Sequence, residues 1–287
     1  MTAAPDTPLA PFGARLRHAM DTRGPLCVGI DPHASLLSAW GLADDVPGLE
    51  RFTMTVVDAL AGSTAVFKPQ SAFFERFGSR GIAVLERAVA AARQAGALVL
   101  MDAKRGDIGS TMAAYAATYL DKDSPLFCDA VTVSPYLGFG SLRPALDAAR
   151  ISGAGVFVLA LTSNPEGAEV QRAVTAGGAS VAQVMLDHIA AENAGALPLG
   201  SVGAVVGATI GDAGADLSVN GPLLAPGIGA QGATPAGLPA VFGAAVRNVL
   251  PSVSRDVLRH GPDVTALRNA VSAYADEVRV AVGTAKG

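Results

Sequence analysis

Hydrophobic residues form short, nearly continuous runs along the chain, separated by longer segments in which apolar positions recur with helical spacing. Continuous runs, as opposed to alternating ones, are typical of parallel strands that are buried on both faces. We therefore predict eight strands, at residues 26–30, 65–68, 97–102, 130–133, 155–161, 202–206, 223–225 and 246–250.

The segments between these runs predict helices. Ile82, Leu85, Val89 and Ala92 follow one another at helical spacing, and residues 264–278 carry the same apolar stripe. Strands that alternate with helices place the chain in the α/β class and indicate a closed parallel barrel. An open, doubly wound sheet is the alternative.

The polar residues that follow the strands favour the barrel. An open sheet gathers its site at one crevice, whereas a barrel uses the carboxyl ends of many strands around a ring. Here almost every predicted strand is followed by a polar or glycine-rich position: Asp31, Lys68, Asp102, Lys104, Ser163, Thr209, residues 227–231 and Arg255. We expect a single-domain (β/α)₈ TIM barrel at residues 24–287. An N-terminal helical extension, residues 1–23, should precede it and cover its bottom.

The composition limits the classes of binding partner that can be expected. The 287 residues are 50% hydrophobic, and 21 basic residues face 25 acidic ones without forming a basic run. This balance argues against nucleic acid or an anionic membrane as a partner, and leaves a phosphorylated small molecule open. The N-terminus does not resemble a signal peptide, and the longest uncharged stretch is broken by Gly and Pro. We expect a soluble cytoplasmic protein.

Cysteine and histidine usage gives no sign of a metal site. Cys27 and Cys128 are too few for a disulfide framework and lack metal-ligand spacing, so reduced, buried thiols are expected. The four histidines are scattered along the chain. The sequence therefore predicts neither a metal nor a disulfide.

The segment from Asp102 to Asp107 is the strongest candidate for chemistry. In an extended strand residues i and i+2 point the same way, so Asp102 and Lys104 should share one direction. Asp107 enters the following loop, and Lys68 ends the neighbouring strand. A Lys–Asp–Lys–Asp array keeps an ammonium group protonated and can hold a proton donor where negative charge develops. Two structural interpretations stay open: Asp107 fits a helix cap, and Asp102 with Lys104 fits a solvated ion pair.

A glycine-rich turn follows the seventh predicted strand. Residues 225–232, with Gly229 and Gln231 among them, would expose backbone amides that can cradle a phosphate. Barrels often bind phosphate with the loops after strands seven and eight, and Arg255 would add a bidentate cation there. A simple tight turn is the alternative.

These residues together resemble the orotidine 5′-phosphate decarboxylase family, in its longer bacterial subgroup. The segment 102–111, Asp-Ala-Lys-Arg-Gly-Asp-Ile-Gly-Ser-Thr, is similar to the family signature. Further matching segments follow in the family's order over residues 24–260: 29–32, 67–70, 162–165, 226–232 and 254–255. The Asp-x-Lys-x-x-Asp core alone is shared with related sugar-phosphate decarboxylases.

The resemblance implies conversion of orotidine 5′-monophosphate to UMP and CO₂ without cofactor or metal. Lys104 would protonate the carbon that CO₂ leaves, Asp102 would lie beside the departing carboxylate, and Lys68 and Asp107 would complete the array. The resemblance also implies a homodimer with shared sites, to which Asp107 and Thr111 contribute across the interface. The remaining substrate contacts that it implies are Asp31 and Thr111 to the ribose, Ser163 to the pyrimidine, and Gln231 and Arg255 to the phosphate.

Two other functions remain open on the sequence alone. A related sugar-phosphate decarboxylase would have the same core and would need a divalent metal. A barrel that binds a nucleotide and regulates a partner would need no catalysis at all.

Overall fold

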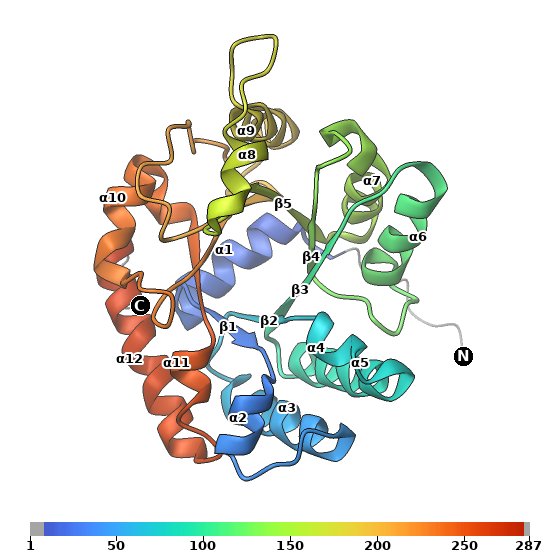
Figure 1. Ribbon diagram of the computed structural model, residues 1–287, viewed down its shortest axis with the longest axis vertical. Helices are drawn as coiled ribbons and strands as arrows, with labels where there is room; N and C mark the ends of the chain where they lie inside the picture. Colours follow the sequence, from blue (N-terminus) through green and yellow to red (C-terminus); the bar gives the residue numbers. More distant parts are fainter. Residues whose placement is uncertain (1–8, 284–287) are drawn as a thin grey trace.

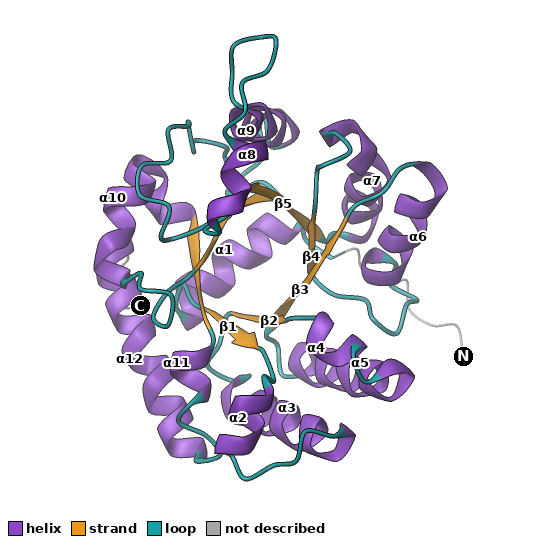
Figure 2. Ribbon diagram, in the orientation of Figure 1, coloured by secondary structure: helices purple, strands orange, loops and turns teal. Residues whose placement is uncertain are grey.

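The computed structural model of the chain describes residues 9–283 and contains the predicted closed barrel (Figures 1 and 2). Eight parallel strands pair in chain order, and β8 pairs with β1 to close the ring. The strands are β1 Cys27–Ile30, β2 Val66–Pro69, β3 Leu98–Arg105, β4 Ala130–Val133, β5 Gly155–Leu161, β6 Val202–Val206, β7 Leu223–Pro226 and β8 Val249–Val253.

Helices surround the ring of strands, as Figure 2 shows in purple around orange. The β6–β7 connection, residues 207–222, contains no helix. The α-helices are α1 Phe12–Arg23, α2 Ala34–Ala39, α3 Val46–Leu60, α4 Ala72–Glu75, α5 Gly78–Gln94, α6 Gly109–Leu120, α7 Arg143–Ser152, α8 Ala168–Gln171, α9 Val181–Glu192, α10 Leu238–Phe242, α11 Arg255–Leu258 and α12 Val264–Val282.

Two predicted strands had boundaries that were wrong by three residues. The last strand was placed at 246–250, but residues 243–248 form a 3₁₀ helix and β8 runs on to Val253. The error follows from Pro251, since proline argues against a strand interior, yet here it pairs with Ala225 of β7. The third strand was ended at Asp102 and in fact reaches Arg105 through an irregularity in its pairing with β4.

Strand residues divide alternately between two apolar clusters. Val66, Leu98, Leu100 and Ala130 belong to the inner cluster, whereas the residue that follows each of them belongs to the larger cluster, which includes the surrounding helices. This is the period of two that an extended chain imposes. One step further along the same inward rows stand polar residues: Lys68, Asp102, Thr132 and Ser252. The barrel interior is therefore apolar below and polar at its carboxyl end.

Helix α1, the described part of the expected N-terminal extension, covers the lower end of the barrel (Figure 1). Residues 1–8 of the predicted extension lie outside the described residues. The Phe12 ring meets Phe157 of β5 edge-on, with ring centroids 5.9 Å apart. Gly13 approaches so closely that a Cβ there would lie 2.1 Å from the Leu199 carbonyl oxygen. Helix and strands thus form one packed core.

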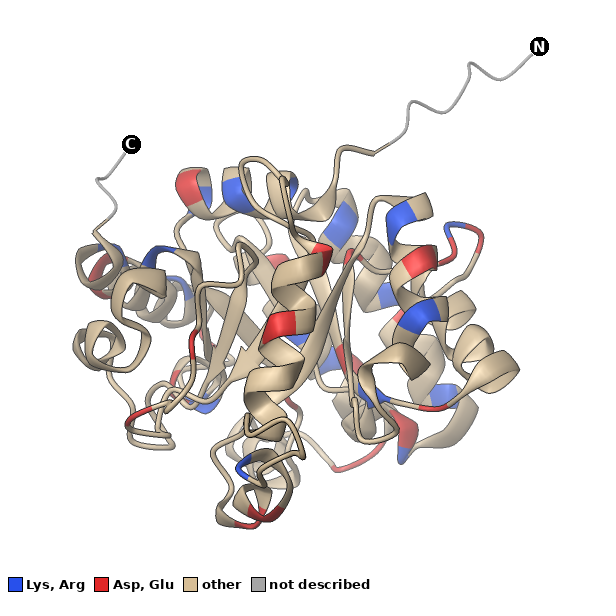
Figure 3. Ribbon diagram, turned by 90° about the horizontal axis from the view of Figure 1, so that it is seen from above, with Lys and Arg blue, Asp and Glu red and all other residues tan. Residues whose placement is uncertain are grey.

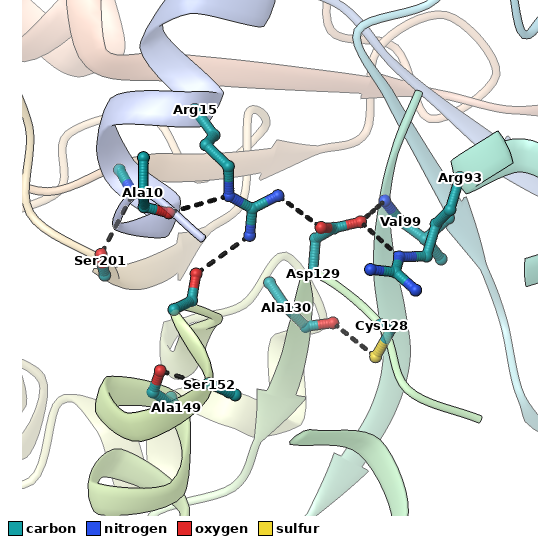
Figure 4. Close-up of polar contacts among 12 residues, drawn as sticks. Ala10, Arg15, Arg93, Val99, Cys128, Asp129, Ala130, Ala149, Ser152 and Ser201 are labelled. Atoms are coloured by element: carbon teal, nitrogen blue, oxygen red, sulfur yellow. Dashed lines mark hydrogen bonds and ion pairs between the residues drawn. The ribbon is translucent and has the colours of Figure 1, made fainter. Parts of the chain in front are cut away.

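A buried ionic cluster at this lower end ties α1, α5 and β3 to the connections that precede β4 and follow α7 (Figure 4). Asp129, only 2% exposed, accepts hydrogen bonds from Arg15 of α1 at 2.5 Å and from the Val99 N–H at 3.0 Å. Arg93 of α5 lies 3.4 Å from Asp129 Oδ2, the oxygen that also accepts from Val99. Arg15 also donates to the Gly153 carbonyl at 3.0 Å. The charge of Asp129 is therefore compensated on both of its carboxylate oxygens.

Charges elsewhere are interspersed, and Figure 3 shows basic and acidic positions intermingled along the ribbon. No helix within residues 9–283 is long and apolar enough to cross a membrane. Both cysteines are buried and unpaired, as predicted, and burial raises the pKa of the Cys27 thiol to about 12. The sequence prediction of a cytoplasmic location stays a prediction.

The Asp129 cluster predicts a large stability loss on truncation. Asp129→Ala would leave Arg15 and Arg93 with uncompensated charge at the barrel bottom, and should lower the free energy of unfolding by about 3–5 kcal/mol in a chemical denaturation experiment. Asp147→Ala is the matched control, because Asp147 is about half exposed and pairs with Arg143 and Arg150 on the surface. Its loss should stay below about 1 kcal/mol. Equal losses in the two variants would contradict the assignment.

Candidate active site

A cavity of about 660 Å³ opens at the carboxyl ends of the strands. It brings together most of the predicted site residues: Asp31, Lys68, Asp102, Lys104, Ser163, Gln231 and Arg255. These residues lie at the ends of six different strands or directly after them, which is how barrels build their sites. Asp107, Thr111 and Gly229 are not among the lining residues.

Asp102 lies between two ammonium groups at the floor of this cavity. The Lys68 Nζ is 2.9 Å from one carboxylate oxygen, and the Lys104 Nζ is 2.6 Å from the other. The Lys68 and Asp102 side chains are less than one tenth exposed, whereas that of Lys104 is 45% exposed. The exposed ammonium is therefore the one that a bound molecule can reach.

Each buried charge depends on its neighbours. Burial by itself raises the pKa of Asp102, but the positive charges of Lys68 and Lys104 outweigh burial and hold the pKa well below its ordinary value. For Lys68 burial lowers the pKa, and the negative charges of Asp102 and Asp31 outweigh it, so the pKa lies above its ordinary value. The Lys68–Asp102 pair is thus fully ionised near neutral pH.

An irregularity in β3 aims Lys104 at Asp102. Met101 pairs with Val131 and Arg105 pairs with Val133, so three residues of β3 face Thr132 alone. Lys104 itself has φ +48°, a left-handed conformation that is rare outside glycine. The Lys104 ammonium meets Asp102 although residue 104 is not in the extended conformation from which the prediction was made.

Asp31 adds a second carboxylate to the cavity, and its negative charge helps to raise the pKa of Lys68. Its Oδ1 is buried and has no hydrogen-bond partner among the described residues. Because a buried acceptor without a donor is costly, this oxygen is suited to accept a hydrogen bond from a bound molecule. Gly29 permits the close packing, since a Cβ there would lie 2.8 Å from Ser254 Cβ.

The glycine-rich turn after β7 lines the cavity through Gly227, Ile228, Ala230 and Gln231. The predicted contact at Gly229 is not brought to the cavity. Its N–H donates to the Ala233 carbonyl at 2.8 Å, and a Cβ would lie 2.0 Å from Asp256 Oδ2. With φ +77°, Gly229 serves the shape of the turn.

Arg255 and Ser163 also line the cavity, after β8 and β5 respectively. Arg255 begins α11, is exposed, and forms no ion pair among residues 9–283. Ser163 follows β5 and packs against Gly207, where a Cβ would lie 2.1 Å from the serine Oγ. The cavity thus offers a guanidinium at one rim and a hydroxyl at another.

Asp107 and Thr111 lie away from the cavity of their own chain. The Asp107 carboxylate accepts a hydrogen bond from the Ile108 N–H at 2.7 Å and contacts neither lysine. It is not the N-cap of α6, since Ile108 holds that position without a side-chain cap. Thr111 is exposed on the first turn of α6. One chain therefore assembles Lys–Asp–Lys, without the fourth member of the predicted array.

Sequence reasoning missed two polar residues that contact the array. Thr132, 1% exposed on β4, donates its hydroxyl to Asp102 Oδ1 at 2.9 Å. Gln70 donates to the Asp102 carbonyl at 3.1 Å and accepts from Lys104 Nζ at 3.4 Å. The sequence signal that could have found Thr132 is a single hydroxyl in the otherwise apolar strand β4, which pairs with β3, the strand that carries Asp102.

No group of three or more His, Cys, Asp or Glu side chains that could hold a metal ion occurs within residues 9–283. The charge of Asp102 is instead matched by lysines. The prediction that no metal takes part stays a prediction.

Comparison with known proteins covers nearly the whole chain. Residues 24–270 match the sequence model of the family described as orotidine 5′-phosphate decarboxylase / HUMPS. The orotidine 5′-phosphate decarboxylase of Streptomyces coelicolor is 74% identical over 275 residues, which are 96% of this chain and 99% of that protein.

Solved structures of the same family are similar to this chain as well. A candidate orotidine 5′-phosphate decarboxylase from Streptomyces avermitilis has 72% identity and a TM-score of 0.96, covering 99% of this chain and 100% of that one. The OMP decarboxylase of Leishmania donovani has 30% identity and a TM-score of 0.77, covering 95% of this chain and 99% of that one.

Proposed function

Because the chain belongs to the orotidine 5′-phosphate decarboxylase / HUMPS family, as its motifs predicted, we propose that it converts orotidine 5′-monophosphate to UMP and CO₂. This reaction is the last step of de novo UMP biosynthesis. The observation that carries the proposal is the Lys104 ammonium, 2.6 Å from Asp102 and facing a cavity large enough for a nucleotide.

The proposed reaction places charge where Lys104 can meet it. As the bond from the pyrimidine ring to the carboxylate breaks, CO₂ leaves and the electron pair stays on the ring carbon, in the ring plane. The Lys104 ammonium stabilises this developing charge and then gives its proton to the carbon. Water reprotonates Lys104, so one proton is consumed for each CO₂ released.

Asp102 has two roles in this proposal. It fixes the ammonium groups of Lys68 and Lys104 on its two oxygens, 2.9 and 2.6 Å away. It also places a negative charge beside the substrate carboxylate, and conversion of that carboxylate to neutral CO₂ relieves the repulsion. Lys68 keeps Asp102 ionised without being exposed itself.

The remaining contacts would hold the substrate far from the reacting bond. We assign Arg255, Gln231 and the turn around Gly229 to the phosphate, Ser163 to the pyrimidine and Asp31 to the ribose. The exposed Arg255 guanidinium supports the phosphate assignment. The unpartnered Asp31 oxygen supports the ribose assignment. Binding energy from such remote groups can help exclude water from the reacting centre.

We further propose a homodimer in which Asp107 and Thr111 complete the site of the second copy. Both residues lie outside their own cavity, and exposed apolar side chains accompany them. Ile108 is 63% exposed and Tyr136 79% exposed, on loops joined by the hydrogen bond from Ser134 N–H to the Arg105 carbonyl. An apolar face of this kind is suited to pairing.

Removing the proton donor should abolish turnover. Lys104→Ala should lose at least about a thousandfold in kcat, since it loses both charge stabilisation and the proton source. The loss of orotidine monophosphate absorbance measures the rate, and circular dichroism checks the fold. Lys122→Ala, at an exposed position outside the cavity, is the control and should keep the wild-type rate. Near-wild-type turnover in Lys104→Ala would remove Lys104 as the donor.

Subunit mixing tests the shared sites. In a hybrid of Asp102→Asn and Asp107→Asn subunits, one of the two sites would regain both acids. A random equimolar mixture should therefore recover about a quarter of wild-type activity if the dimer is symmetric. Mixing Asp102→Asn with Lys104→Ala should recover nothing, because both residues serve the same subunit's site. Absence of recovery in the first mixture, with subunit exchange verified, would refute shared sites.

Cofactor independence separates this function from its nearest alternative. A sugar-phosphate decarboxylase with the same Asp-x-Lys-x-x-Asp core would need a divalent metal. We expect turnover of orotidine monophosphate to be unchanged after dialysis against EDTA, and not to rise when Mg²⁺ is returned. A chelator-sensitive rate would favour the metal-dependent alternative, and UMP binding without any turnover would favour a non-catalytic nucleotide-binding barrel.

A further inference from the structure

The hydroxyl of Thr132 lies at the point where β3 departs from regular pairing. Between the pairs Met101–Val131 and Arg105–Val133, residues 102–104 have only Thr132 opposite them. The Lys104 N–H is thereby displaced from the β4 backbone. It donates instead to the Thr132 Oγ1, at 2.9 Å.

The same oxygen also contacts the Asp102 carboxylate. Thr132 donates its hydroxyl hydrogen to Asp102 Oδ1 at 2.9 Å, and this is the oxygen that accepts the Lys104 ammonium at 2.6 Å. One buried hydroxyl therefore joins the main chain of Lys104 to the carboxylate that holds its side chain. The hydrogen bond that Thr132 accepts fixes where its own proton points, toward Asp102.

From this geometry we propose that Thr132 is a positioning residue for the decarboxylation, which sets the conformation of Lys104 and the orientation of Asp102. The inference rests on the proposed function of Lys104 as proton donor. Lys104 has φ +48°, and a non-glycine residue keeps such a conformation only when its surroundings impose it. The hydrogen bond to Thr132 is the contact made by its N–H, and so the one that substitution can remove.

A packing role alone predicts a different behaviour. If Thr132 only filled space in the inward row above Ala130, valine would replace it without consequence, since the two side chains have nearly the same shape. If the hydroxyl positions the acid and the lysine, valine removes both hydrogen bonds and serine keeps them. The pair of substitutions therefore separates shape from hydrogen bonding.

The experiment compares steady-state kinetics of Thr132→Val, Thr132→Ser and wild type with orotidine monophosphate. We expect Thr132→Val to lower kcat by roughly 10- to 100-fold, because small displacements of a reacting group cost rate steeply. KM should change less than about threefold, since Thr132 does not contact the remote binding groups. Thr132→Ser should restore kcat to within about threefold of wild type.

Thr53→Val is the matched control. Thr53 is also a fully buried threonine, on α3, and its hydroxyl has no hydrogen-bond partner in the described part of the chain. It should keep wild-type kcat and KM. If Thr132→Val does not fold, Thr132→Ala takes its place with the same expected kcat loss.

The outcomes distinguish this inference from the function on which it rests. Wild-type enzyme without turnover would refute the proposed function. Crystal structures of the variants would still report whether, without the hydroxyl, Lys104 departs from φ +48° and its ammonium loses the hydrogen bond to Asp102. An active wild type with undiminished kcat in a folded Thr132→Val would overturn the positioning role. Equal impairment of the valine and serine variants would overturn it as well.

Discussion

The buried carboxylate of Asp102 is the constraint that organises the site. An ionised acid at the end of an apolar barrel is stable only if positive charge lies against it, and here two ammonium groups occupy its two oxygens. Neither lysine can be exchanged without changing the environment of the other two groups. The proposed proton donor is thus held in place by the same ion pairs that make burial of the acid tolerable.

The position of this cluster follows from strand geometry. Inward-facing residues of a barrel recur every second position, so each strand contributes one apolar layer and then one residue at the cavity. Leu100 lies two residues before Asp102, and Val66 lies two residues before Lys68. Both Leu100 and Val66 belong to the inner apolar cluster. The ionic groups consequently rest on a packed floor, which limits water to the side from which a substrate enters.

The strand ends explain how much the sequence could predict. Asp31, Lys68 and Asp102 were recognised because a charged residue at the end of an apolar run lies at the carboxyl end of a parallel barrel. Thr132 escaped notice because threonine is common in strands, and its value depends on which residue lies across the ladder. That information exists only once the pairing of β3 with β4, including its irregularity, is known.

The reach of Lys104 shows why that irregularity matters. Two residues along a regular strand advance by about 6.6 Å, so a lysine at that position would begin a full step above Asp102. The long side chain could still return, but it would have many other conformations open toward the cavity. A left-handed residue folds the chain back locally, and the ammonium meets Asp102 at 2.6 Å while remaining 45% exposed. Proton donation needs both properties at once: a fixed position next to the acid and access to the substrate. A regular strand would give the ammonium access to the substrate but would not fix its position next to Asp102.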